Sequence, residues 1–155
     1  MRERIQQATK DAMKSGDKRR LSTLRLVTAA IKDRDIAGRV DASGHSTGRE
    51  RVEDAEILAL LQKMIKQRRE SAEIYRQGGR DELAEQELAE IAIIEEFLPR
   101  QMDEDEMREA ARAIVAEVGA TGLKDMGRVM AALKERYTGQ MDFSKASAMV
   151  KDALK

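Results

Sequence analysis

Carboxylates are the side chains with the greatest potential for chemistry, because they crowd into the segment DELAEQELAEIAIIEE at 81–96. Two carboxyl groups that face one cleft in different environments can perform general acid–base catalysis. Glutamates paired with histidines at i, i+3 can hold metal ions inside a helical bundle. The only histidine is His45, in a polar segment far along the chain from these glutamates. We therefore interpret 81–96 as a solvated acidic face, and predict neither a metal site nor a cofactor.

The serines give no clearer indication of catalysis. A serine nucleophile needs a neighbouring base, and none of these serines has a histidine in a segment expected to be ordered. The chain has no cysteine, no glycine-rich phosphate loop and no strand–turn–helix elbow. We predict no catalytic residue.

Basic residues recur at helical spacing and could bind an anion. Those of the second expected helix are seven residues apart, which places them in one slowly drifting stripe. Such a stripe can follow phosphates, and each neutralised phosphate releases counterions. A solvated face, or ion pairs with the glutamates at 81–96, would explain it equally well. The stripe consists of Lys18, Arg25, Lys32 and Arg39, with Arg19 and Arg20 beside its start, and Lys66, Arg69 and Arg76 with Lys63 and Arg68 follow on the next helix.

Charge and composition narrow the classes of partner. Residues 1–80 and 111–155 carry an excess of basic side chains, whereas 81–110 are strongly acidic, so that the formal net charge is zero. This segregation favours either polyanion recognition or attraction between the helices themselves. Aromatics make up only 3% of the residues, which argues against stacking on single-stranded bases and favours recognition by backbone and shape. The N-terminus lacks a signal peptide and no apolar run is long enough to span a membrane, so we predict a soluble, cytoplasmic protein.

Hydrophobic period and punctuation predict an all-α protein. Pro99 cannot continue the fourth helix, and it therefore marks a boundary between an N-terminal bundle of about four helices, residues 1–98, and a small three-helix C-terminal domain, residues 99–155. Residues 39–51 are polar and rich in glycine and serine, which is typical of a mobile loop. The expected helices cover about 2–14, 17–38, 52–77, 80–97, 103–119, 123–137 and 144 onward.

Individual residues carry further expectations. Asp17 is predicted to cap the second helix, and Asp103 with Glu106 to form a capping box before the fifth. Gly127 lies inside an expected helix, where glycine costs about 1 kcal/mol relative to alanine, so we predict close approach by another helix or by a ligand's backbone. The methionines of the tail are expected core fillers. In the fourth helix, the residues expected to point inward are Leu83, Leu88, Ile91, Ile94 and Leu98.

Three stretches together resemble one protein family. They are LSTLRLVTAAIKDRDI at 21–36, KMIKQRRESAEIYRQGGRDELAEQELAEIAIIEEFLPRQM at 63–102 and LKDMGRVMAAL at 123–133. The chain resembles the GatB/YqeY family over nearly its whole length, and more closely the stand-alone YqeY-like branch. The resemblance implies a helical front bundle, with a tail similar to the C-terminal domain of the aspartyl/glutamyl-tRNA amidotransferase B subunit. In that enzyme the tail helps to hold the tRNA while catalysis lies elsewhere.

The resemblance also associates the chain with carbon–nitrogen ligase activity that uses glutamine as amido-N-donor. However, the chain lacks an amidase-type nucleophile loop and an ATP-binding segment. Amide groups at the start of the sixth helix would also favour an anion. The loop at 139–143 lacks the basic residue that the family commonly has, so we expect Asp142 to begin the last helix rather than the loop to contact tRNA. The tail residues that match the family's motif are Lys124, Asp125, Gly127 and Arg128, with Lys134 and Lys151 as outer contacts.

Two hypotheses of function follow. The first is a non-catalytic module that binds tRNA or aminoacyl-tRNA through the tail, with Arg19, Arg20, Arg25 and Lys32 as a second, sequence-blind anchor and no affinity for DNA. The alternative is a protein-interaction adaptor of a translation-related complex without direct RNA binding, indicated by the acidic segment and the methionine-rich tail. An enzyme that transfers amide groups alone is a third reading that the residues do not support.

Overall fold

The computed structural model describes all residues from Met1 to Lys155, and its regular structure is entirely helical. Seven α-helices and one short 3₁₀ helix, η1, follow one another, and the only strand-like pairing is an isolated bridge between Val40 and Ser46. The predicted all-α class is therefore confirmed. The helices gather into two compact units, Met1–Leu98 and Pro99–Lys155. None of the helices combines the length and the apolar character that a membrane span requires.

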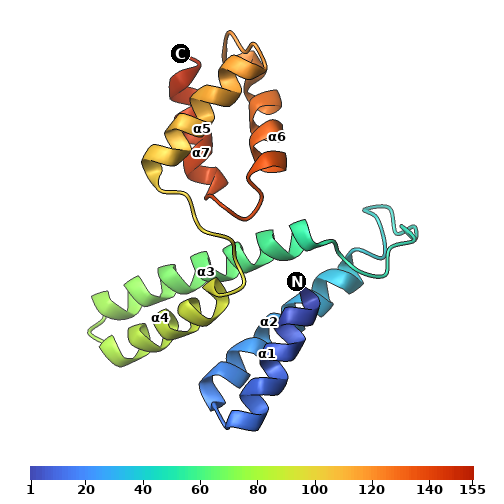
Figure 1. Cartoon of the computed structure of the whole chain (residues 1–155), viewed down its shortest axis with the longest axis vertical. Helices are drawn as coiled ribbons and strands as arrows, with labels where there is room; N and C mark the ends of the chain where they lie inside the picture. The colour runs from blue at the N-terminus through green and yellow to red at the C-terminus, as the bar shows by residue number, and fades with distance from the viewer. The chain divides into compact units, whose positions relative to one another are not determined.

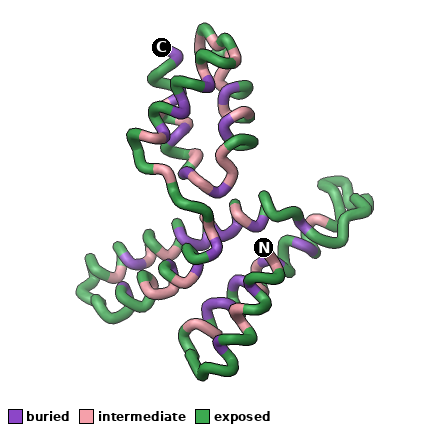
Figure 2. Tube along the Cα trace, viewed as in Figure 1, coloured by how far each residue is buried: buried purple, intermediate pink, exposed green.

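The first unit consists of two helical pairs (Figure 1). α1 (Arg2–Ser15) packs against α2 (Lys18–Ala37), and α3 (Asp54–Gln77) packs along α4 (Asp81–Glu95). Because α2 also contacts α4, the two pairs share one apolar core. Figure 2 shows the buried residues along the sides where the helices face one another. Fully buried side chains of this core include Ile5, Leu24, Val27, Ile57, Leu61 and Ile94.

The start and the orientation of α2 follow from local sequence. Gly16 ends α1 with a φ of 74°, a conformation that glycine adopts without the steric cost of a side chain. The Asp17 carboxylate then accepts the backbone N–H of Arg20 at 3.0 Å, which confirms Asp17 as the cap. Leu24 and Val27 are completely buried. The opposite face of α2 is consequently turned to solvent.

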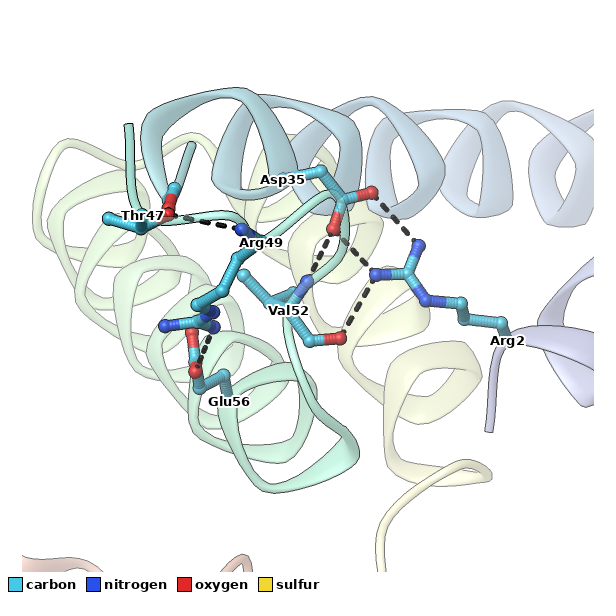
Figure 3. Close-up of polar contacts among 7 residues, drawn as sticks. Arg2, Asp35, Thr47, Arg49, Val52 and Glu56 are labelled. Atoms are coloured by element: carbon cyan, nitrogen blue, oxygen red, sulfur yellow. Dashed lines mark hydrogen bonds and ion pairs between the residues drawn. The ribbon is translucent and has the colours of Figure 1, made fainter. Parts of the chain in front are cut away.

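The other end of α2 is held by a buried ion pair (Figure 3). Asp35 is only 8% exposed, and its carboxylate accepts hydrogen bonds from the Arg2 guanidinium at 2.5 and 3.0 Å and from the Val52 backbone N–H at 2.8 Å. Arg2 also donates to the Val52 carbonyl at 3.1 Å. The hydrogen bond from Arg2 is the main reason that the pKa of Asp35 lies below its usual value. This cluster ties the starts of α1 and α3 to the end of α2.

Residues 39–51, predicted as a mobile loop, contain a hydrogen-bonded turn. Val40 and Ser46 pair across it as an isolated antiparallel bridge. The Asp41 carboxylate accepts the backbone N–H groups of Ser43 and His45, both at 2.9 Å. An aspartate that bonds its own following backbone in this way stabilises a turn, which composition alone does not reveal.

The prediction that Leu83 and Leu88 of α4 point inward is wrong. Leu83 and Leu88 are each 37% exposed, whereas Ala84 and Phe97 are buried. Ile91 and Ile94 are buried as predicted. The first turns of α4 lie toward the free end of the α3–α4 pair (Figure 1), where a single partner covers a narrower stripe than the pattern suggested.

The second unit is a three-helix arrangement around its own core. α5 (Glu104–Glu117) begins with the predicted capping box, α6 (Met126–Arg136) follows η1 (Leu123–Asp125), and α7 (Phe143–Ala153) begins at Asp142. The Asp142 carboxylate accepts the backbone N–H of Ser144 at 2.9 Å, so this residue begins the last helix as expected. The single helix predicted over 123–137 is split, because the Asp125 N–H bonds the carbonyl of Gly122 in a 3₁₀ turn. The methionines fill the core or pack against it, namely Met102, Met107, Met126, Met130, Met141 and Met149.

Candidate nucleic-acid interface

Two glutamates of α4 form ion pairs within the first unit. Glu90 accepts from Arg68 at 3.0 Å, and the two side chains are only 15% and 14% exposed. Glu95 pairs with Arg69 at 2.9 Å. The interpretation of this segment as a solvated acidic face holds for Asp81, Glu82 and Glu85, which are exposed and without an ion pair. Two later glutamates of the segment depart from it, because arginines of α3 bind them.

An ion pair with the acidic segment also occupies Arg20, one of the predicted RNA contacts. Arg20 of α2 binds Glu96, which directly follows α4, at 2.5 Å. Arg4 of α1 donates to the Glu96 carbonyl and lies over the Phe97 ring. Arg20 thus links α2 to the end of α4, and an anion in solution would have to compete with this contact.

Glu87 of α4 is partly buried, and burial disfavours the ionised form of its carboxyl group. Burial raises its pKa, the neighbouring charge of Glu90 raises it further, and Arg68 opposes both effects. For a carboxyl group whose pKa is raised in the folded state, the contribution to stability is fully present at pH values below the pKa of the unfolded chain, about 4.3 for glutamate. This contribution is lost as the pH rises through the folded-state pKa.

We therefore expect Glu87→Gln to raise the melting temperature at neutral pH and to leave it unchanged well below about pH 4, where the wild-type carboxyl is protonated in both states. Circular dichroism melts of both proteins over a pH series would measure this. Glu85→Gln, at an exposed position of the same helix, is the matched control and should shift neither melt. An equal shift at all pH values would contradict the ionisation argument.

The remaining stripe residues of α2 are free to meet a ligand. Arg19, Arg25 and Lys32 are exposed, and none of their side chains forms an ion pair or hydrogen bond within the protein. Lys18 lies on the same face and is also exposed. A shallow hollow of about 400 Å³ follows this face and is lined by Lys18, Leu21, Ser22, Arg25 and Leu26.

A second hollow, of about 420 Å³, lies between α2 and α3. Arg34 contributes to it from α2 and Lys63 from α3, and neither has an ion pair. Asp33 adds one negative charge, and Leu60 and Met64 supply apolar surface. Sequence patterns do not reveal this site, because Arg34 lies outside the seven-residue stripe and meets Lys63 only through tertiary packing.

The start of α6 carries the two central residues of the tail motif. Lys124 lies on η1, exposed and without an ion pair, while Arg128 of the first turn of α6 pairs with Asp125 at 3.2 Å. Asp125 also accepts the Thr121 backbone N–H at 2.9 Å, and this bond is the main reason that its pKa is lowered. The positive end of this helix is therefore partly neutralised by the chain's own carboxylate.

The two outer candidates of the tail lie apart from this pair along their helices. Lys134 lies in the last turn of α6 and Lys151 in the last turn of α7. Both are exposed, and neither has an ion pair. A ligand that contacted all four tail cations would have to extend along the second unit rather than occupy one pocket.

Gly127 is not a close-packing residue within the protein. A Cβ atom built at this position meets no other atom within 4 Å, so the prediction that another helix approaches it is wrong. The approach of a ligand's backbone is the alternative that the open space leaves.

We expect Gly127→Ala to stabilise the second unit by up to about 1 kcal/mol, because alanine loses less backbone entropy in a helix and meets no neighbour here. Thermal unfolding followed by circular dichroism would measure the change. If an RNA backbone lies against this position, the same variant should bind RNA more weakly although it is more stable. A destabilised variant would contradict the open environment of Gly127.

The turn at 39–51 brings the only histidine beside a serine. Ser43 Oγ lies 2.7 Å from His45 Nδ1 and 2.7 Å from an oxygen of Asp41. The single hydroxyl hydrogen is donated to the carboxylate, which can only accept, so the histidine must donate Nδ1–H to the serine oxygen. His45 therefore cannot take the hydroxyl proton, and the contact stabilises the turn instead of activating a nucleophile.

These features define a class of protein: a helical protein of two compact units that carries exposed cations on its helices, some of which line open hollows. The chain belongs to the family described as Yqey-like protein, whose sequence profile matches residues 2–154. This confirms the resemblance to the stand-alone YqeY-like branch. The relation of residues 99–155 to the amidotransferase tail stays a prediction.

Two fungal proteins are similar to the chain. A protein of Pyrenophora tritici-repentis named altered inheritance of mitochondria protein 41, mitochondrial, is 30% identical over 138 residues, which cover 86% of this chain and 71% of that protein. The protein of the same name from Eremothecium gossypii is 26% identical over 153 residues, covering 97% and 78%. Both names refer to mitochondria, so these relatives do not support the cytoplasmic location, which stays a prediction.

Proposed function

We propose that this protein is a non-catalytic, tRNA-associated module that binds the sugar–phosphate backbone through exposed cations of both units. The observation that carries the proposal is that most of the predicted RNA contacts have no acidic partner within the protein. Arg20 and Arg128 have acidic partners. The other six predicted contacts are exposed and without an ion pair: Lys124, Lys134, Lys151, Arg19, Arg25 and Lys32.

The chemistry of these surfaces favours phosphate over the bases. Exposed, unpaired lysines and arginines neutralise phosphates and release counterions. Aromatic side chains for base stacking are scarce, and one of the four, Phe97, is buried. Sequence-blind recognition of a folded RNA by backbone and shape fits this surface best.

Fluorescence anisotropy with total tRNA at two salt concentrations tests the proposal, with duplex DNA as the competing ligand. We expect micromolar or tighter binding that prefers tRNA and weakens as salt rises. Absence of binding at low salt would refute the proposal. A parallel assay with glutamine should detect no release of ammonia, since the chain has no arrangement of groups for amide hydrolysis.

A second candidate, the protein-interaction adaptor, is supported by large apolar side chains at the surface. Ile74 is 67% exposed and Ile36 58% exposed. Capture of partners from nuclease-treated lysate separates the two functions. A translation-related partner that survives nuclease treatment, together with absent tRNA binding, would favour the adaptor.

A further inference from the structure

The outward face of α2 carries cations at a fixed interval. Lys18, Arg25 and Lys32 are seven residues apart, and we call them the α2 ladder. An α-helix rises 1.5 Å per residue, so neighbouring members stand about 10.5 Å apart along the axis. Their directions differ by only about 20° per interval, so they project from one side.

The ladder is held in place before any ligand arrives. Asp17 caps the start of α2, and the buried pair of Asp35 with Arg2 fixes its end. The burial of Leu24 and Val27 sets the rotation of the helix about its axis. The spacing of the three Cα atoms that carry these cations is therefore a rigid property of the fold.

The surface between the first two members suits a sugar–phosphate backbone. Lys18 and Arg25 line the 400 Å³ hollow, and Leu21 and Leu26 supply apolar surface to it. A backbone strand likewise alternates anionic phosphates with sugars whose carbon atoms are apolar. The small side chains Ser22 and Ala29 lie on the same exposed face and leave room for close approach.

We propose that the α2 ladder binds phosphates along one strand of a base-paired RNA stem, an inference that rests on the proposed function. A stem presents phosphates at regular, fixed positions, which evenly spaced cations on a rigid helix can match. A single strand adapts its backbone to any arrangement of charges, and its recognition normally adds stacking on aromatics, which α2 lacks entirely.

The test moves one cation without changing composition or charge. In the double variant Ser22→Arg, Arg25→Ser, the middle cation shifts by three residues, to an exposed position with no acidic side chain one turn away on either side. The probes are a blunt RNA hairpin stem and an oligouridine of equal length, titrated by anisotropy over a salt series. Ser22→Ala alone is the control for the lost hydroxyl and should bind both probes as the wild type does.

We expect the double variant to bind the stem about fivefold more weakly, with the slope of log K against log salt reduced by about 0.9, as for one lost phosphate contact. Its affinity for oligouridine should stay within about twofold of the wild type, because a flexible strand follows the moved charge. Circular dichroism should show the same helicity and only a slightly lower melting temperature, because the moved arginine stands one turn from Lys18 and Arg19.

Each negative binding result identifies which of the two proposals is wrong. If the wild type binds tRNA and the double variant binds the stem equally well, the ladder is wrong while the proposed function stands. If the wild type binds oligouridine and not the stem, the ladder is again wrong. If the wild type binds neither RNA at low salt but binds an acidic helical peptide, both proposals fail and α2 is a protein-docking surface.

Discussion

Replacing Asp35 with alanine should lower the free energy of unfolding of the first unit by about 3 kcal/mol, the lower end of the range for breaking a buried ion pair. The change leaves the Arg2 guanidinium without its carboxylate and the Val52 N–H without its acceptor, in a site that solvent reaches poorly. A buried donor left unsatisfied bears its full desolvation cost. Urea unfolding followed by circular dichroism would measure the loss.

Asp33→Ala is the matched control, since Asp33 is exposed on the same helix and has no ion pair. It should change stability by no more than about 0.5 kcal/mol. Combining Asp35→Ala with Arg2→Ala should cost less than the sum of the two single changes, because each removes the same interaction. A loss below about 1 kcal/mol for Asp35→Ala would mean that the pair behaves as an exposed one.

Acid should remove the same contribution without a mutation. The hydrogen bond from Arg2 holds the folded-state pKa of Asp35 below its unfolded value of about 3.9. The stabilisation is therefore fully present above about pH 4 and is lost as the pH falls through the folded-state pKa. Asp35→Asn should be less stable than the wild type at neutral pH and should lose less stability on acidification. Urea midpoints measured from neutral to acidic pH would show whether the two curves converge.

The helices were predictable because their signals are local. Gly16 and Asp17 end one helix and begin the next within two residues, and Asp103 reaches the N–H of Glu106 within a single turn. Such signals involve neighbours in sequence and survive in any tertiary context. The error at Leu83 and Leu88 has the opposite origin. Helical period identifies the apolar residues of α4, but only the packing partners decide how wide a stripe they cover.

The candidate site was predictable only as a set of residue types. The sequence shows cations at helical spacing, yet it cannot distinguish Arg20, which binds Glu96, from Arg19 and Arg25, which remain free. The deciding acid lies 76 residues from Arg20. For the same reason the Asp35 cluster, which joins Arg2 of α1, Asp35 of α2 and Val52 just before α3, has no signature in any single stretch.

Reversing Lys124 and Arg128 to glutamate should weaken tRNA binding by about 10- to 100-fold if the start of α6 contacts phosphate. Losing an exposed charge contact costs on the order of 1 kcal/mol, and 1.4 kcal/mol corresponds to a factor of ten. Two reversals add repulsion to two lost contacts. Anisotropy with total tRNA at fixed salt would measure the change. The fold should tolerate it, because negative charge at a helix N-terminus is favourable.

The second unit offers an unusually close control in α5. Arg108 pairs with Asp105 at i, i+3 and 3.1 Å, just as Arg128 pairs with Asp125 at i, i+3 and 3.2 Å. Arg112 stands four residues beyond Arg108, as Lys124 stands four residues before Arg128, and it is likewise exposed. The variant Arg108→Glu, Arg112→Glu therefore reverses two cations with the same spacing on another helix. It changes the net charge by the same amount and removes an equivalent ion pair.

Comparison of the two double reversals decides whether tRNA contacts a specific site at α6 or responds to the overall charge of the second unit. If only the α6 reversal weakens binding, position matters more than net charge, and the tail motif marks a contact. If both weaken it equally, tRNA responds to the overall charge of the unit, and the residues carried over from the family motif have no special role. Unchanged affinity in the α6 variant would refute the tail assignment outright, and would leave the cations of α2 as the remaining anchor for RNA.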